Sequence, residues 1–430
     1  MKIIPKLALA AVLATSVSGV VLTAPAVAQK KDKAQENGGL KLSPEALKAA
    51  QAAQPVLQQK NYAAADPLVS AVEAAAKTED DKYIAAAMRY ELESGKLYAA
   101  QQANPNAPVD EAVLAKPLDA LIASPSTPAA DKPRYVYRRG ALAYNGKQYP
   151  IALQYFQQAK QLGYNDPNLP MLIVKSKIET GDVAGGVGEL SSVIDQMNAS
   201  GQKAPEDYYK YAIGRVNKAK MVPETLTWMR KWLSAYPTAQ NWRNVLVIYG
   251  LQQGSLATLD KNQKLDLFRL MRASKSLADQ NDYMEYAQYA TDKGLPAEAA
   301  TVLKEGMATG KIPAGNATAK AMLAAAEAKS KQEGSLAPTE ARAKSANDGK
   351  LAALTAEAYY GQGNYAKAAE LYRLALQKGG VDANEVNTRL GIALAASGDK
   401  AGAKAAFDAV KGAPRADLAS FWNTWLQTQA

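Results

Sequence analysis

Apolar positions along this chain follow the spacing of helices. They recur at i, i+3, i+4 and i+7, as at Leu351, Leu354 and Ala358, and this spacing places side chains on one face of an α-helix. Alternation with a period of two, which would indicate strands, is almost absent. Polar or Gly/Pro clusters separate predicted helices of about 12 to 16 residues. The sequence therefore predicts an all-α fold of antiparallel helix hairpins. The clearest separators are Asn104-Pro105, Asp166-Pro167, residues 201–205 and Pro237.

A second pattern repeats every 34 or 35 residues. Gly363, Ala368 and Tyr372 are followed 35 residues later by Gly398, Ala403 and Phe407. A pair near the middle of the chain repeats with a spacing of 34, and its matching positions are Gly140, Tyr149, Ala152, Phe156 and Ala159 against Val174, Val183, Gly186, Leu190 and Val193. Such a period, with small residues where two helices touch, is typical of a helical repeat array.

These repeats resemble the tetratricopeptide repeat family, as an exported bacterial member. Seven copies of graded quality follow the pattern, from residues 46–78 to the pair within 349–411. The resemblance implies a right-handed superhelix of antiparallel helix hairpins that binds ligands along the concave face of its first helices. The expected segments are a signal peptide (1–28), a disordered tail (29–42), an N-terminal array (43–255), linking helices with a degenerate repeat (256–348), and a C-terminal pair with a capping helix (349–430).

The first 28 residues have the layout of a secretory signal peptide. Lys2 and Lys6 precede an apolar run from Leu7 to Val21, and Ala26-Val27-Ala28 fits a cleavage site. The apolar run is too short for a typical membrane span. We expect export, cleavage after Ala28, and a periplasmic mature protein with no transmembrane segment. The alternative is an uncleaved anchor helix.

Residue types that support most enzyme and metal chemistry are missing. The chain has no histidine and no cysteine, which excludes imidazole and thiolate ligands, disulfides, and Ser-His or Cys-His nucleophiles. Ser200-Gly201-Gln202-Lys203 and Ser397-Gly398-Asp399-Lys400 fit S-x-x-K, but the S-D-N and K-T-G motifs of penicillin-recognising enzymes are not present. Glu79-Asp80-Asp81 fits a helix start. We predict no enzymatic activity, no cofactor and no metal.

Positive charge is concentrated in one segment. The whole chain has a net charge of +10, and residues 203–275 alone hold thirteen Lys/Arg and five Asp/Glu, a net charge of +8. Aromatic residues share the segment: Tyr208, Tyr209, Tyr211, Trp228, Trp232, Tyr236, Trp242 and Tyr249. One interpretation is that the rings belong to the repeat core and the lysines are simply solvated. The other is a binding surface for acidic peptides, anionic glycans or lipid head groups. Nucleic acid is disfavoured because an exported protein rarely meets it.

The family resemblance gives candidate groove positions. They are Arg134, Tyr137, Tyr144, Asn145, Lys175, Lys210, Asn217 and Arg243. Arginine and tyrosine supply planar contacts and hydrogen bonds to carboxylates. We predict a non-catalytic periplasmic scaffold that binds acidic or extended segments of protein partners, in cell-envelope assembly or export. The alternatives are a glycan-acting envelope enzyme with a pair of carboxylates, or a carbohydrate-binding subunit that uses the same groove.

Overall fold

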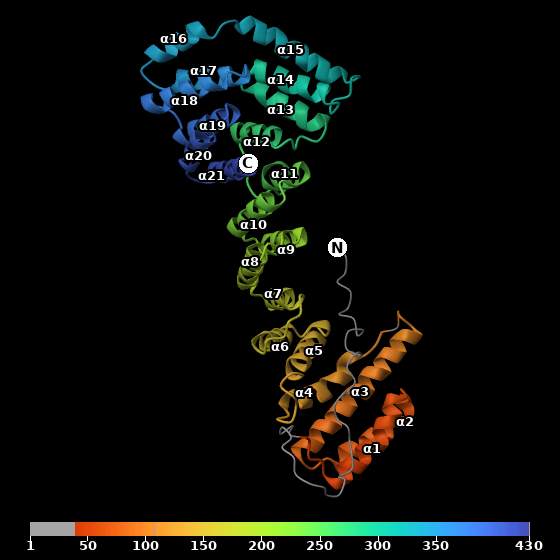
Figure 1. The fold of residues 1–430 in the computed structure, drawn as a ribbon. Coiled ribbons are helices and arrows are strands. Elements are labelled where there is room, and N and C mark those ends of the chain that lie inside the picture. Colours follow the sequence, from red (N-terminus) through yellow and green to blue (C-terminus); the bar gives the residue numbers. More distant parts are fainter. Residues whose placement is uncertain (1–38, 107, 430) are drawn as a thin grey trace. The chain divides into compact units, whose positions relative to one another are not determined.

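The computed structural model describes residues 39–106 and 108–429. The predicted signal peptide and residues 29–38 of the predicted tail lie outside this part. The described residues form 21 α-helices, one 3-10 helix and one π-helical turn, with no strand among them (Figure 1). The predicted all-α fold of helix hairpins is therefore confirmed. None of the helices in these two ranges combines the length and the apolar surface needed to cross a bilayer.

The chain divides into two compact units, residues 1–203 and 204–430. The predicted boundaries at 255/256 and 348/349 both lie inside the second unit. Unit 1 contains α1 (Pro44–Gln58), α2 (Tyr62–Ala75), α3 (Glu79–Ala103), the 3-10 helix η2 (Glu111–Leu114), α4 (Ala115–Ala123), α5 (Lys132–Asn145), α6 (Tyr149–Gln161), α7 (Leu169–Glu179) and α8 (Val183–Ala199).

Unit 2 holds the remaining helices. They are α9 (Glu206–Lys218), α10 (Val222–Ala235), α11 (Ala239–Leu246), the π-helical turn η3 (Val247–Leu251), α12 (Lys261–Ala273), α13 (Gln280–Asp292), α14 (Pro296–Ala308), α15 (Ala317–Glu333), α16 (Ala337–Ser345), α17 (Lys350–Gly361), α18 (Tyr365–Lys378), α19 (Ala383–Ala396), α20 (Lys400–Asp408) and α21 (Arg415–Gln427).

Seven hairpins share one turn geometry. In each, the first helix ends two residues before a single residue at positive φ, which is followed by the N-cap residue and the next helix. Glycine fills this position in four of the seven hairpins. A left-handed backbone is strained for residues with a Cβ atom, so glycine suits it best. The seven positions are Lys60, Lys147, Gly181, Lys220, Gly294, Gly363 and Gly398.

Fixed positions around this turn form the interior of each hairpin. Five residues after the turn residue stands a small, fully buried one, such as Ala65, Ala152, Ala368 or Ala403, each 0 % exposed. Nine residues after the turn stands a large buried residue that meets the first helix. A Cβ atom added at Gly391 would lie 2.5 Å from the Phe407 ring, so only glycine permits this close helix contact. The small residues predicted from the repeat are thus in the core.

The start of α3 confirms the predicted role of the acidic cluster at residues 79–81. Thr78 and Asp81 form a capping box, in which each side chain accepts a hydrogen bond from the other's backbone N–H. Asp81 Oδ1 also accepts from the Ser43 N–H at 2.9 Å, which ties the start of α1 to that of α3. Burial would raise the pKa of Asp81, but the N–H groups of Thr78, Ser43 and Lys77 hold it well below its usual range.

The C-terminal helices of unit 2 fold back onto its first helices. Helix α14 packs against α17, α12 packs against α19 and α21, and α10 packs against α21; Figure 1 shows α14 beside α17. At the closest point a Cβ atom on Gly361 would lie 3.2 Å from the backbone of Glu298. Tyr249 donates to the Pro414 carbonyl at 2.8 Å and packs edge-on against Phe421. Helix α21 therefore covers α20, as expected of a cap, and also joins the two ends of unit 2.

The segment predicted to hold linking helices, residues 256–348, is mostly helical. Its first helix begins at Lys261, because Asp260 and Gln263 form a capping box there. Residues 309–316 are a loop. Most of 331–350 belongs to α15 and α16. Only Ala343 is buried in α16, and the helix is held mainly by Glu340, which accepts from Tyr359 and pairs with Lys367.

Candidate functional site

The predicted groove residues fall into two sets, one in each unit. The five in unit 1 lie on α5 and α7. The Tyr137 ring stacks on Tyr164 with ring centres 4.6 Å apart, and Tyr144 packs edge-on against Tyr149. Burial is the main cause that raises the pKa of Tyr137. These two rings therefore contribute to packing within and next to the α5–α6 hairpin more than to an open surface.

The polar members of the unit 1 set have partners within the unit. The Arg134 guanidinium lies 3.3 Å from Asp131 and 5.3 Å from the centre of the Tyr135 ring. Asn145 donates to Glu111 at 3.2 Å. Lys175 is half-buried on α7. Acidic residues therefore neutralise part of the positive charge expected here.

In unit 2 the predicted residues are also partly neutralised. Arg243 on α11 forms an ion pair with Asp282 of α13. Lys210 on α9 lies 3.2 Å from Glu206, and its ammonium sits 5.5 Å from the centre of the Trp232 ring. Asn217 is exposed in the last turn of α9. The structure thus brings Lys210 and Asn217 to one hairpin and places Arg243 in an ion pair on the next helix.

The hairpin of α9 and α10 carries several cations that lie over aromatic rings. Lys231 lies 5.0 Å from the centre of the Trp228 ring, and Arg215 lies 5.1 Å from that of Tyr211. Cations over ring faces at such distances are attracted by the ring quadrupole. Lys218 and Lys220 are exposed, and neither forms an ion pair within the described residues. We call Lys210, Arg215, Lys218, Lys220 and Lys231 the α9–α10 basic surface.

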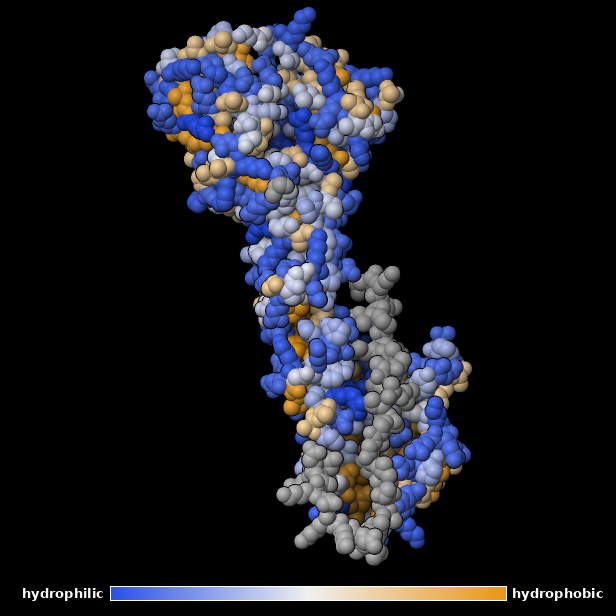
Figure 2. Space-filling model, in the orientation of Figure 1, coloured by the Kyte–Doolittle hydropathy of each residue, from blue (hydrophilic) through white to orange (hydrophobic). Residues whose placement is uncertain are grey.

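The rings under these cations are themselves buried. Trp228 and Trp232 are only 4 % and 5 % exposed, and Trp232 donates its indole N–H to Glu206 at 2.9 Å. The face of α9 and α10 drawn in Figure 2 is largely hydrophilic. The surface therefore offers charged and polar groups to a ligand. It offers no open indole face.

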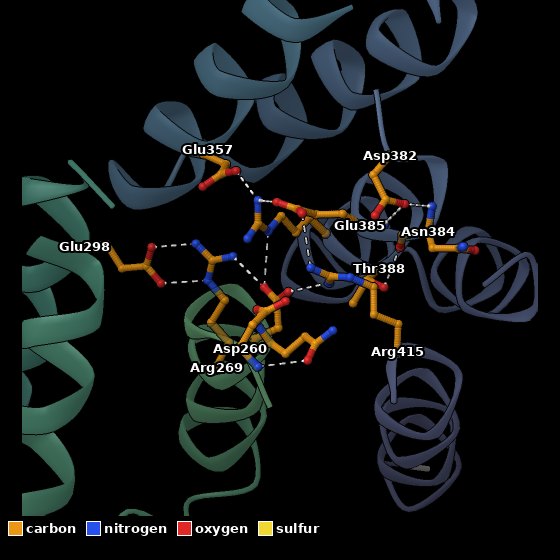
Figure 3. A network of polar contacts seen from close by, with 12 residues as sticks. Asp260, Arg269, Glu298, Glu357, Asp382, Asn384, Glu385, Thr388 and Arg415 are labelled. Carbon is orange, nitrogen blue, oxygen red and sulfur yellow. Dashed lines mark hydrogen bonds and ion pairs between the residues drawn. The ribbon is translucent and has the colours of Figure 1, made fainter. Parts of the chain in front are cut away.

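A second polar cluster lies inside unit 2, where its first and last helices meet (Figure 3). Asp266 of α12 is at its centre and accepts hydrogen bonds from Arg269 at 3.0 Å, Arg389 at 3.3 Å and Arg415 at 3.0 Å. Its seven members come from α12, α14, α17, α19 and α21, and we call them the buried ion network: Asp266, Arg269, Glu298, Glu357, Glu385, Arg389 and Arg415.

The outer carboxylates of the network provide further partners for the guanidiniums. Glu298 accepts from Arg269 at 2.8 and 2.7 Å, a bidentate pair, and also from the Tyr286 hydroxyl. Glu357 and Glu385 both pair with Arg389. The side chains of Arg269 and Asp266 are 1 % and 0 % exposed. The carboxylates of Glu298 and Glu357 are also enclosed, whereas the Glu385 side chain is 22 % exposed. The network fits a role in holding helices together.

Electrostatics within the network differ between its acids. Burial would raise the pKa of Asp266, but the surrounding arginines, Arg389 first, hold it below its usual range. Glu357 is different, because burial raises its pKa despite Arg389. Four carboxylates face three guanidiniums in the network, so one carboxylate is in excess.

Sequence reasoning did not identify this network. The sequence did contain an indication of it. Asp266 and Arg269 are the two charged residues within an otherwise apolar stretch, whose other members are Leu265, Leu267, Phe268, Leu270 and Met271. Charged residues three apart inside an apolar run point to a buried ion pair, because single charges are costly in a core.

The two S-x-x-K sequences show ordinary turn contacts. The hydroxyl of Ser200 donates to the Met197 carbonyl, and that of Ser397 to the Leu394 carbonyl, each within its own helix end. Lys400 donates instead to the Gln429 carbonyl. Within the described residues, no group of three acidic side chains gathers in a way that could hold a metal ion.

Comparison with known proteins gives little further information. No protein-family model matches the chain, and no curated protein matches it significantly. Among solved structures, the chain is similar to the pentatricopeptide repeat protein PPR10 from maize, with 14% identity and a TM-score of 0.28. The match covers 85% of this chain and 54% of that one, so it spans about half of the maize protein. A TM-score this low carries no argument, and the helical-hairpin fold rests on the helices and turns described above.

Proposed function

We propose that this chain is a non-catalytic, exported helical-hairpin protein that binds acidic segments of partner proteins through the α9–α10 basic surface. The observation that carries the proposal is the pairing of cations with rings on one hairpin, beside two exposed lysines that have no acidic partner in the described residues. Ring-held cations are pre-positioned, so less side-chain entropy is lost on binding a carboxylate. Export to the periplasm is part of the proposal and rests on residues 1–28.

Burial of the indoles favours a peptide over a sugar as the ligand. Carbohydrate sites commonly stack a sugar on an open aromatic face, whereas Trp228 and Trp232 are buried and covered by Lys231 and Lys210. An acidic peptide needs only the charges. The same arrangement supports binding over catalysis, because the carboxylates of the buried ion network are enclosed and paired.

Binding of a fluorescent decaglutamate peptide, followed by anisotropy, tests the proposal. We expect binding at low salt that weakens steeply as salt rises, because the Debye length falls from about 30 Å at 0.01 M to about 8 Å at 0.15 M. The double variant Lys218→Glu/Lys220→Glu should weaken binding about tenfold, as expected if each reversed charge costs a fraction of a kcal/mol to about 1 kcal/mol.

A matched control separates a specific surface from general attraction to a basic protein. Lys329 and Lys331 on α15 have the same spacing as Lys218 and Lys220 and are equally exposed. The variant Lys329→Glu/Lys331→Glu has the same net charge as the α9–α10 variant and should bind like the wild type. Equal loss in both variants, or binding that is insensitive to salt, contradicts the proposal.

A further inference from the structure

The backbone of the hairpin turns has one unusual feature. Four residues other than glycine have positive φ in the described part of the chain, and all four are lysines: Lys60, Lys147, Lys220 and Lys275, with φ between 56° and 59°. Asparagine and aspartate are the residues that usually tolerate this conformation when glycine is absent. The choice of lysine therefore needs a reason other than backbone preference.

Three of these lysines occupy the turn position that glycine fills in the other four hairpins. The backbone requirement is the same in both cases. Each lysine N–H donates to a carbonyl in the last turn of the preceding helix, as Lys220 does to Asn217 at 2.9 Å and Lys147 to Tyr144 at 3.0 Å. Glycine would thus make the same turn with less strain.

The helix dipole explains why a positive side chain is favoured at these turns, but it does not distinguish one turn from another. Cations near a helix C-terminus are favoured, and this applies equally to Lys60, Lys147 and Lys220. Lys220 belongs to the α9–α10 basic surface and stands two residues after the exposed Lys218. Lys60 and Lys147 are exposed at the same turn position in unit 1, so they serve as internal references for what the turn alone requires.

We propose that Lys220 is the residue that anchors a carboxylate of the acidic partner segment. The inference rests on the proposed function and names the contact within the same surface. The turn hydrogen bonds of Lys220 and Met221, at 2.9 and 3.0 Å, fix the backbone beneath the ammonium. A cation on a fixed backbone binds a carboxylate with less loss of freedom than one on a mobile loop.

The test measures binding and stability of the full chain together. All five tryptophans lie in unit 2, at positions 228, 232, 242, 422 and 425, so tryptophan fluorescence during urea unfolding reports on that unit. Lys220→Gly should raise the urea midpoint, because it relieves the strain, and weaken decaglutamate binding about threefold. Lys220→Arg should keep wild-type binding.

Lys147→Gly is the control for the turn itself. It relieves the same strain in unit 1, so binding and the tryptophan midpoint should both stay at wild-type values. If Lys220→Gly binds the peptide as the wild type does, the inference is wrong. In that case the proposed function stands if the Lys218→Glu/Lys220→Glu variant still loses binding. If the wild type does not bind the peptide, both ideas are overturned.

Discussion

Two sets of charged residues in unit 2 differ in burial and in pairing. The buried ion network uses arginines at places from which water is excluded, and each guanidinium meets two or more carboxylate oxygens. The α9–α10 basic surface uses mostly lysines that face solvent, and two of them pair with no acid in the described residues. Arginine suits the first place because its planar fork can satisfy several acceptors at once, while a lysine ammonium is a compact charge on a flexible stem.

The difference separates residues that hold the fold from residues that are free to bind. Removing one partner from a buried network leaves an unpaired charge in a dry environment, which is costly. An exposed lysine contributes little to stability because water and salt screen it. Charge alone therefore does not identify a binding site. Burial and pairing decide which role a cation has.

The largest expected effect comes from breaking the network. Arg269→Met removes the bidentate pair with Glu298 and the contact with Asp266. Both acids would then be buried without this partner, so we expect a loss of about 3–5 kcal/mol in the free energy of unfolding of unit 2. Urea unfolding followed by tryptophan fluorescence measures it. Lys218→Met is the exposed control and should stay within about 0.5 kcal/mol of wild type; equal midpoints for the two variants contradict the comparison.

An overpacking substitution in the core of the same unit should reduce stability less than Arg269→Met does. Ala368 of α18 is 0 % exposed in the small-residue position of its hairpin. Ala368→Leu should overpack that contact and cost about 1–3 kcal/mol, less than loss of the arginine. Ala366→Leu on the exposed side of the same helix is the matched control. A wild-type midpoint for Ala368→Leu would show that the repeat register is not what determines packing there.

The pH dependence distinguishes the two acids of the network. The folded pKa of Glu357 is raised by burial, so its contribution to stability is complete below its unfolded pKa and is lost as pH rises through the folded value. Asp266 has the opposite sign: its lowered pKa gives stability that is lost as pH falls. The stability of the wild type relative to Glu357→Gln should therefore fall by about 1.4 kcal/mol per pH unit between the unfolded and the folded pKa of Glu357, and stay level above the folded pKa.

Urea midpoints between pH 3 and pH 9 measure this difference. Glu340→Gln is a useful comparison, since Lys344 and other hydrogen-bond partners lower the pKa of Glu340 to about 2, so the effect of this variant should appear on the acid side of the range. Parallel midpoint curves for wild type and Glu357→Gln across this range would mean that folding does not raise the pKa of Glu357.

The hairpins could be predicted from the sequence because their rules are local. Ala152, Phe156 and their equivalents 34 residues later occupy fixed positions around a turn, and each hairpin needs only its own residues to form. The acidic helix start at 79–81 was predicted for the same reason. The folding of α17–α21 onto α10–α14 could not be predicted, because it depends on contacts between residues far apart in the sequence, such as Arg389 with Asp266, 123 residues apart.

The candidate site shows the same limit. A net charge of +8 in residues 203–275 correctly located a basic segment. It could not show that Arg269 is buried in the network while Lys218 is exposed, although both count equally toward that charge. The resemblance placed Arg243 in a groove, and its ion pair with Asp282 from a different helix hairpin is likewise invisible in the sequence.

The smallest expected effect on stability is also the sharpest test of the comparison. Lys218→Glu/Lys220→Glu reverses two charges that contact no acid in the described residues, so unit 2 should unfold within about 0.5 kcal/mol of wild type. A modest loss is expected at most, because both lysines lie near the C-terminal end of α9, where the helix dipole favours cations. The tryptophan midpoint checks this directly. If the urea midpoint of this variant is as low as that of Arg269→Met, the exposed lysines contribute to the stability of the fold. Any loss of peptide binding in that variant would then report unfolding instead of a lost contact.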